Sequence, residues 1–179
     1  MDYDFGDILD ARNAPVGHFI VVVGQVSRKD KITKEEKNEI MYYIITSRVY
    51  AVFKDILAFF NDCLSRKDKH FIKHFSKESK KTSITPHGLL SQTLFLDKET
   101  NYNTCLDLES MVVVKSDPEL MDKTALESLK SDGKVIYRNK LAKLDAFSLI
   151  QIIKYSNDVS VDRKNKIFTC FNKIKHSLK

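Results

Sequence analysis

The feature that most constrains this chain is a long apolar stretch with helical spacing between residues 40 and 64. Apolar residues recur there in steps of three and four, at Met41, Ile45, Val49, Val52, Ile56, Phe59 and Cys63. A second set widens the stripe: Ile44, Phe53, Leu57, Phe60 and Leu64. Thr33 and Glu36 precede it as a capping box, which is typical of a helix start. The spacing predicts a long helix, apolar over much of its circumference, at the centre of the domain.

The remaining patterns predict shorter elements around this helix. The β-branched run 18–27 indicates a buried strand, and short strands are expected at 93–96, 104–108 and 111–115, two of them paired across the polar 98–103 loop. Asp117 and Pro118 mark a helix start, and Gly133 a helix end near Ser131. A short strand at 135–137 and helices over 141–155 and from Ser160 onward complete the list. The predicted fold class is α+β, a helix-dominated single domain with a long central helix and one small β-sheet.

Composition favours one domain preceded by a short tail. The 179 residues include only 5 Gly and 3 Pro, and no linker of Pro, Ser and Gly divides them. Asp2, Asp4, Asp7 and Asp10 give the first eleven residues a charge of −4. We therefore expect an acidic N-terminal tail over residues 1–12, which occupies a basic patch on its own or a neighbouring molecule, and a globular domain over 13–179.

The same residues argue against a membrane or secreted protein. Acidic residues stand where a secretory signal would carry positive charge. The apolar stretch 40–60 is interrupted by Arg48, Lys54 and Asp55, which are costly inside a bilayer. The cysteines Cys63, Cys105 and Cys170 are odd in number and form no CxxC motif. This pattern favours reduced thiols and a cytoplasmic or nuclear location.

The net charge of +6 is concentrated in two basic blocks. Residues 66–81, RKDKHFIKHFSKESKK, hold seven Lys and Arg against two acids, and residues 160–179 also carry a net +5. On a helical wheel, one face of the first block collects basic side chains while Phe71, Ile72 and Phe75 lie opposite. The predicted binding residues of this ridge are Arg66, Lys69, Lys73, Lys77, Lys80 and Lys81. Such a ridge attracts polyanions, although a solvated Lys-rich face is the competing interpretation.

The sequence gives little support for a catalytic site or a metal site. His70 and His74 are spaced to share a helix face, but Phe71 stands where a zincin has Glu, and the surrounding lysines oppose a cation. Asp107 and Glu109 would share one face of a strand, with a solvated face the favoured interpretation over a metal or acid–base pair. No nucleotide-binding or hydrolase motif occurs, and nothing local marks Cys63 or Cys105 as a nucleophile. We expect no cofactor, no metal and no enzymatic activity.

Three functional hypotheses follow. The first is a small basic intracellular protein that binds nucleic acid or another polyanion, without sequence specificity, through the Lys-rich ridge. The second is a protein-interaction module, such as a viral or phage accessory factor, which uses a groove beside the central helix or the terminal helix. The third is a cryptic metal-dependent nuclease with Asp107 and Glu109. A homo-oligomer is compatible with each of them.

Overall fold

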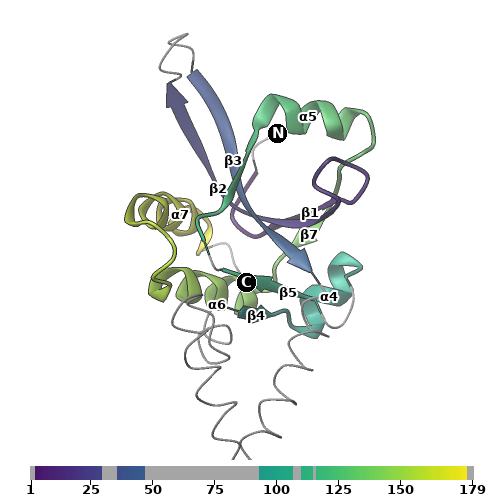
Figure 1. Ribbon diagram of the computed structural model, residues 1–179. Helices are drawn as coiled ribbons and strands as arrows, with labels where there is room; N and C mark the ends of the chain where they lie inside the picture. The colour runs from purple at the N-terminus through teal and green to yellow at the C-terminus, as the bar shows by residue number, and fades with distance from the viewer. Residues whose placement is uncertain (1–2, 30–35, 47–92, 107–109, 115, 177–179) are drawn as a thin grey trace, which may run out of the picture.

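The computed structural model describes residues 3–29, 36–46, 93–106, 110–114 and 116–176. Helices and strands take about equal shares of these residues, so the predicted helix-dominated fold with one small sheet is wrong. Seven antiparallel strands form one sheet that curls into a half-barrel (Figure 1). In chain order the elements are β1 (Asp7–Ala11), β2 (His18–Lys29), β3 (Glu36–Thr46), β4 (Thr93–Phe95), α4 (Lys98–Thr104), β5 (Met111–Val113), β6 (Glu119–Asp122), α5 (Lys123–Ser131), β7 (Ile136–Lys140), α6 (Lys143–Tyr155) and α7 (Val161–Ile174).

The long hairpin of β2 and β3 organises the sheet. The strand order is β4-β5-β3-β2-β1-β7, and β6 also pairs with β3. The strands β1 and β7 therefore extend the sheet from β2, and β5, β4 and β6 extend it from β3. Ile20 pairs with Ile44 and Val22 with Tyr42 in the antiparallel register. The β2 strand confirms the prediction from the 18–27 run. Beyond the sheet the hairpin projects as a two-stranded arm (Figure 1), where Ser27 to Lys29 and Glu36 to Asn38 are exposed.

The strand β3 overturns the predicted start of the central helix. Residues 40–46 lie in a strand that is buried on both of its faces, since Met41 and Tyr43 point to one hydrophobic cluster and Ile40 and Tyr42 to the other. A strand buried on both faces has no polar residue at every second position. An uninterrupted apolar run also fulfils any three- or four-residue spacing, which is why helical periodicity was misleading here. The rest of the predicted central helix lies outside the described residues.

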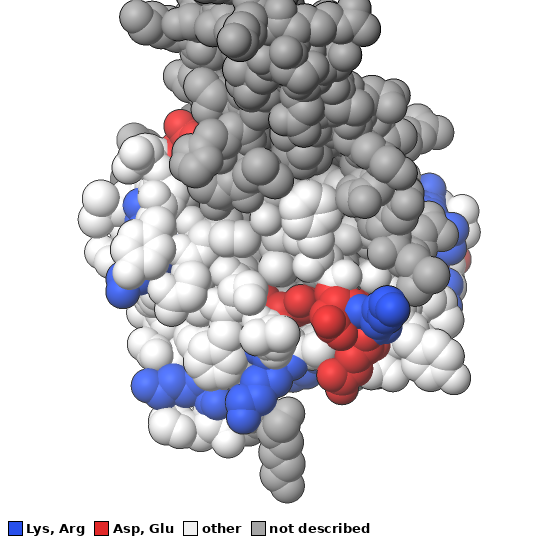
Figure 2. All heavy atoms as spheres, turned by 90° about the horizontal axis from the view of Figure 1, so that it is seen from below, with Lys and Arg blue, Asp and Glu red and all other residues white. Residues whose placement is uncertain are grey.

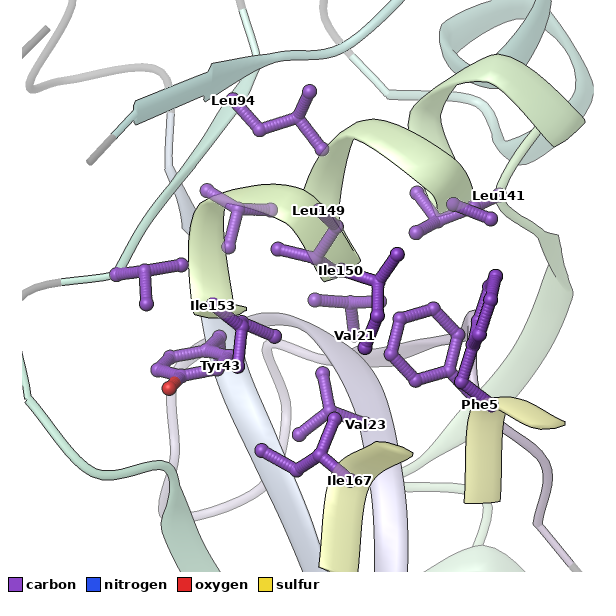
Figure 3. Packing of buried hydrophobic residues seen from close by; sticks show 14 of the residues in the cluster. Phe5, Val21, Val23, Tyr43, Leu94, Leu141, Leu149, Ile150, Ile153 and Ile167 are labelled. Atoms are coloured by element: carbon purple, nitrogen blue, oxygen red, sulfur yellow. The ribbon is translucent and has the colours of Figure 1, made fainter. Parts of the chain in front are cut away.

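Helices cover both faces of the sheet. On one face, which we call the α6–α7 face, Val21 and Val23 of β2 pack with Leu149 and Ile153 of α6 and Ile167 of α7 (Figure 3). On the opposite face, which we call the α5 face, Ile20 and Val22 pack with side chains that include Leu126 of α5 and Val135. The Phe171 ring of α7 makes edge contacts with Phe5 and with Phe147 at ring-centre distances of 5.1 and 5.3 Å. The sheet is thus the middle layer of the fold.

The N-terminal aspartates do not form a free tail over the described part of residues 1–12. Residues 7–11 are strand β1, paired with β2 on one side and β7 on the other. Apolar side chains between the aspartates, such as Phe5 and Leu9, are fully buried. The strand tolerates the acids because basic residues neutralise them: Asp10 pairs with Arg138, and Asp7 lies 3.6 Å from Lys140. Charge alone suggested a tail because these partners are distant in sequence.

The predictions for the second half of the chain are largely confirmed. The strands at 93–96 and 111–115 appear as β4 and β5 and pair with each other. Their connection contains helix α4, capped by Asp97, where a polar loop was predicted. The strand predicted at 104–108 is wrong over its described residues, because Thr104 ends this helix and Cys105 is its C-cap. Helix α5 begins at Lys123 after Asp122 as cap, later than predicted, because residues 119–122 pair with β3 as β6. It ends at Ser131 as predicted, while Gly133 has a φ of +69°. Helices α6 and α7 also lie where the patterns placed them.

Gly24 of β2 provides a test of how closely α7 packs on the sheet. A Cβ atom at this position would lie 2.8 Å from Cε of Met41 and 2.9 Å from Sγ of Cys170. We expect Gly24→Ala to lower the free energy of unfolding by about 1–3 kcal/mol, because overpacking forces neighbouring side chains off their rotamers. Cys170→Ala removes one of the two clashing atoms. In urea denaturation, the cost of Gly24→Ala should therefore be smaller in the Cys170→Ala background. An equal cost in both backgrounds would contradict this packing.

Candidate functional site

The residues predicted to carry function lie mostly outside the described part of the chain. This applies to the whole ridge, Arg66, Lys69, Lys73, Lys77, Lys80 and Lys81, and to the histidines and acids weighed as metal or catalytic residues, His70, His74, Asp107 and Glu109. The ridge and its polyanion remain predictions from sequence. The geometry of the described residues points to two other places, the outer surface of α6 and a polar cavity beside Arg12.

The second basic block is partly described, as helix α7. Its apolar stripe docks into the core through the buried Ile167, Phe171 and Ile174, as the sequence predicted by default. Two of its lysines have partners within the chain: Lys164 Nζ donates to the Ser156 carbonyl oxygen, and Lys166 Nζ donates to Asp162. The helix is therefore primarily a structural element.

The outer surface of α6 is unusual because large apolar side chains face solvent there. Leu144 is 69% exposed, Phe147 37% and Tyr155 72%. With the exposed Gln151, these residues follow one another in steps of three, four and four, so they form one stripe along the helix. The opposite side of α6 is buried in the core. We call Leu144, Phe147, Gln151 and Tyr155 the α6 stripe.

The charged side chains that α6 itself exposes are basic. Lys143 and Lys154 are exposed near its two ends, and Lys154 Nζ lies 5.2 Å from the centre of the Tyr155 ring. The single acid of α6, Asp145, is buried on the other side. There it accepts hydrogen bonds from the Thr100 hydroxyl and the Asp97 backbone N–H, while burial raises its pKa above the usual range. No carboxylate of α6 therefore balances the lysines beside the stripe.

Figure 2 shows the face of the molecule that is seen from below in Figure 1. Lys and Arg side chains lie at several places around the edge of this face, and some of them are directly next to the group of Asp and Glu side chains.

A cavity of about 150 Å³ opens where the β1–β2 loop, the end of β3 and the end of α4 meet. Its polar lining residues are Arg12, His18, Thr46, Cys105 and Ser110, and its apolar ones are Gly17, Phe19, Ile45 and Leu106. Among the described residues, no Asp or Glu lines it. The residues come from four separate parts of the sequence. Nothing near Cys105 in the sequence marks it as a functional residue. Cys105 and His18 are far apart in the sequence, so no local spacing shows that both line this cavity.

Arg12 is held firmly beside this cavity. Its Nε and Nη2 donate to the two carboxylate oxygens of Asp10 at 2.9 Å each, and its guanidinium stacks 4.5 Å from the centre of the Phe19 ring. Nη2 of Arg138 donates to the same Asp10 carboxylate at 2.6 Å. The hydrogen bonds from Arg12, followed by those from Arg138, hold the pKa of Asp10 well below its usual range despite burial. The carboxylate stays ionised and fixes the guanidinium.

Cys105 is held in an unusual backbone conformation at the edge of the cavity. It ends α4 with a φ of 57°, in the left-handed region, and its N–H bonds to the Asn101 carbonyl oxygen. Its side chain is exposed. Within the described residues, no group of three or more His, Cys, Asp and Glu side chains is placed to hold a metal ion.

No protein-family model matches this chain, and no curated protein or solved structure gives a significant match. In the part of the chain that the structure describes, every helix is too short or too polar to cross a membrane. The interpretation of function consequently depends on the α6 stripe, the cavity and the charge distribution.

The two buried aspartates of β1 should respond oppositely to neutralisation. Asp10 has a lowered pKa, so its ionised form stabilises the fold above the unfolded value near 3.9, and this contribution is lost as the pH falls toward the folded pKa. Burial raises the pKa of Asp7, so ionisation of Asp7 opposes folding above the same value. We expect Asp10→Asn to cost about 1–3 kcal/mol at pH 7, since it removes the buried carboxylate that accepts hydrogen bonds from Arg12 and Arg138.

Asp7→Asn is the matched control, and it should leave the protein at least as stable as wild type at pH 7. Urea denaturation of both variants between pH 7 and pH 3 measures the effect. The cost of Asp10→Asn should shrink below about pH 4. An Asp10→Asn variant as stable as wild type at pH 7 would show that the Asp10 carboxylate does not stabilise β1.

Proposed function

We propose that this protein is a non-enzymatic interaction module that binds a partner protein through the α6 stripe. The observation that carries the proposal is the exposure of Leu144, Phe147 and Tyr155 on one side of a helix whose other side is already buried. A surface helix ordinarily turns polar residues to water, as α7 does with Asn165 and Thr169. Several large apolar side chains exposed on one helix face are typical of an interface.

The arrangement suits a protein partner. Positions 144, 147, 151 and 155 follow the spacing by which helices pack against other helices or insert into a groove. Leu144 and Tyr155, at the two ends of the stripe, are eleven positions apart, which corresponds to about 16 Å or three helical turns. Tyr155 and Phe147 offer large contact areas with few rotatable bonds, and Tyr is among the residues enriched in interface hot spots.

The charges favour an acidic partner segment. Lys143 and Lys154 flank the stripe, and the helix presents no acid on this side because Asp145 is buried. An amphipathic segment with apolar residues in its middle and Asp or Glu at its ends would match both features. A second copy of this chain fits less well, because its own Lys143 and Lys154 would approach those of the first. We place this interaction inside the cell, in agreement with the three cysteines and the lack of a CxxC motif.

Nucleic-acid binding by the 66–81 ridge is the second candidate function. The observation that favours it is the local charge of seven Lys and Arg against two acids. Binding of this kind uses backbone phosphates and releases counterions, so it gives affinity without sequence specificity. It is compatible with the first function, because the ridge and the α6 stripe are separate segments of the chain.

Substitution of the α6 stripe tests the first function. We expect Leu144→Glu with Tyr155→Glu to leave stability within about 1 kcal/mol, since both side chains are largely exposed. Affinity for the partner should fall about thirtyfold or more, as for the loss of an interface hot spot. Tyr102→Glu is the matched control, because Tyr102 is 86% exposed and lies on a different helix, α4.

The partner is found by photo-crosslinking in native cells, with benzoylphenylalanine at position 155 or, as control, at position 102. A discrete protein adduct should form at 155, fail to form at 102, and disappear when Leu144→Glu is added. Sedimentation of the purified protein shows whether the protein associates with itself, and so distinguishes a second copy from a different protein as the partner. Identical adducts from both positions, or adducts that survive Leu144→Glu, would refute binding through the stripe.

A charge reversal tests the second function. For labelled single- and double-stranded RNA and DNA, the logarithm of affinity should fall linearly with the logarithm of salt concentration. Lys73→Glu with Lys77→Glu should weaken binding to all sequences alike and make this salt slope shallower. Lys173→Glu with Lys175→Glu, at exposed positions near the end of α7, is the matched control. Wild-type binding that is absent, or that both pairs reduce equally, would contradict a role for the ridge.

A further inference from the structure

Helix α6 contains one acid, and that acid is buried on the side opposite to the α6 stripe. Asp145 stands in the first turn of α6, next to Lys143 and Leu144 in sequence, and is 3% exposed. Its Oδ2 accepts hydrogen bonds from the Thr100 hydroxyl at 2.5 Å and from the Asp97 backbone N–H at 2.9 Å. In the described part of the chain, no Lys or Arg forms an ion pair with it. A buried carboxylate without a cationic partner is uncommon, because its charged form is costly to bury.

The hydroxyl of Thr100 connects this carboxylate to the start of α6. Thr100 Oγ1 donates to Asp145 and accepts from the Ala142 backbone N–H at 2.9 Å. Ala142 is the N-cap residue of α6, and its side chain has no oxygen that could cap the helix. The protonation state of Asp145 is therefore coupled to the turn that begins the stripe, because one hydroxyl serves both groups.

The charged groups that α4 directs at Asp145 are acidic. Burial raises the pKa of Asp145 above its usual range, and the negative charges of Asp97 and Glu99 raise it further. The hydrogen bonds from Thr100 and from the Asp97 N–H lower this pKa, but they leave it above the ordinary value near 3.9. Geometry alone predicts the same direction, because the carboxyl group is enclosed and its charged neighbours on α4 have its own sign.

The other described elements around the start of α6 supply no cation that pairs with Asp145. Lys140, at the end of β7, has its Nζ 2.7 Å from a carboxylate oxygen of Asp4 and 3.6 Å from one of Asp7. Lys143 of α6 is exposed on the solvent side of the helix. Strand β4, which also packs on α6, contains no charged residue. Within the described residues, the charge of Asp145 is thus held by hydrogen bonds alone.

We propose that uptake of a proton by Asp145 strengthens the binding of an acidic partner segment to the α6 stripe. This inference rests on the proposed function of the stripe. With Lys143 and Lys154 against one ionised Asp145, α6 has a net charge of +1, and protonation raises this to +2. The greater positive charge attracts an acidic segment more strongly. By linkage, the carboxylates of the bound partner favour the protonated form of Asp145 to the same extent.

Proton uptake also favours the folded state. Because the pKa of Asp145 is higher in the folded than in the unfolded protein, its neutral form adds stability below the unfolded value near 3.9, and this stability is lost as the pH rises through the folded pKa. Asp145→Asn imitates the neutral form, since an amide oxygen at the Oδ2 position can accept both hydrogen bonds. At pH 7 its urea midpoint should equal or exceed that of wild type.

Photo-crosslinking in cell extracts at two pH values tests the proposal. The full chain carries benzoylphenylalanine at position 155, and the extracts are buffered at pH 7 or pH 5. At pH 7, Asp145→Asn should give about two- to fivefold more adduct than wild type, as expected for one charge near an exposed pair, and at pH 5 the two yields should converge. Asp162→Asn is the matched control, because the hydrogen bond from Lys166 holds the pKa of Asp162 below its usual range. Its yield relative to wild type should be no greater at pH 7 than at pH 5.

Carbon-13 NMR of the carboxyl groups of the wild-type protein covers the case in which Asp145→Asn fails to fold. The Asp145 resonance should still change with pH above about pH 5, where an ordinary Asp is already ionised. The proposal is overturned if this resonance stops changing below about pH 5, or if the ratio of Asp145→Asn adduct to wild-type adduct is the same at both pH values. Absence of any adduct at either pH would instead refute binding through the stripe, and this inference with it.

Discussion

The rest of the structure depends on the pairing of β2 with β3 and on the burial of that pair from both sides. Alternate residues of β2 serve two clusters: Val21 and Val23 pack on the α6–α7 face, and Ile20 and Val22 on the α5 face. Each fully buried aliphatic side chain contributes about 1.5–3 kcal/mol, so this hairpin is the largest local source of hydrophobic stabilisation in the described chain. β1, β5 and β6 then pair with its two strands, β7 and β4 extend the sheet beyond β1 and β5, and α7 packs on β2 where Gly24 leaves room for Cys170.

This arrangement explains why helix α6 has apolar side chains that the core does not bury. Helix α6 fills the α6–α7 face with Leu149, Ile150 and Ile153, which completes the core on that side. Leu144 and Tyr155 lie outside that core and are exposed to solvent. Because Lys143 and Lys154 are exposed and Asp145 is buried, the charges that α6 exposes are positive. The proposed interaction with an acidic partner segment would account for these features together.

Local signals in the sequence were sufficient for α6, α7 and the end of α5, but they predicted neither α4 nor the start of α5. Ser160 caps α7, Gly133 follows α5, and the apolar stripe of α7 points inward, as each short-range pattern predicted. Local signals failed for β3 and β1, where tertiary context decides the conformation. Burial on both faces removes the alternation that identifies a strand, and Asp10 is stabilised by Arg138, which lies far away in the chain. The same limit applies to the candidate sites. Cys105, His18 and Arg12 meet through folding alone, and whether Leu144 and Tyr155 are exposed depends on which side of α6 the sheet occupies.

Nuclear Overhauser spectroscopy of the isotope-labelled protein, combined with amide hydrogen exchange, tests most directly whether residues 36–46 form the central strand. The account predicts cross-strand contacts between Ile20 and Ile44 and between Val22 and Tyr42, with slow amide exchange in the middle of both strands. Contacts between residues three apart over 36–46, together with strong sequential amide–amide contacts, would indicate a helix. That result would contradict the sheet, both of its hydrophobic faces and the placement of the α6 stripe.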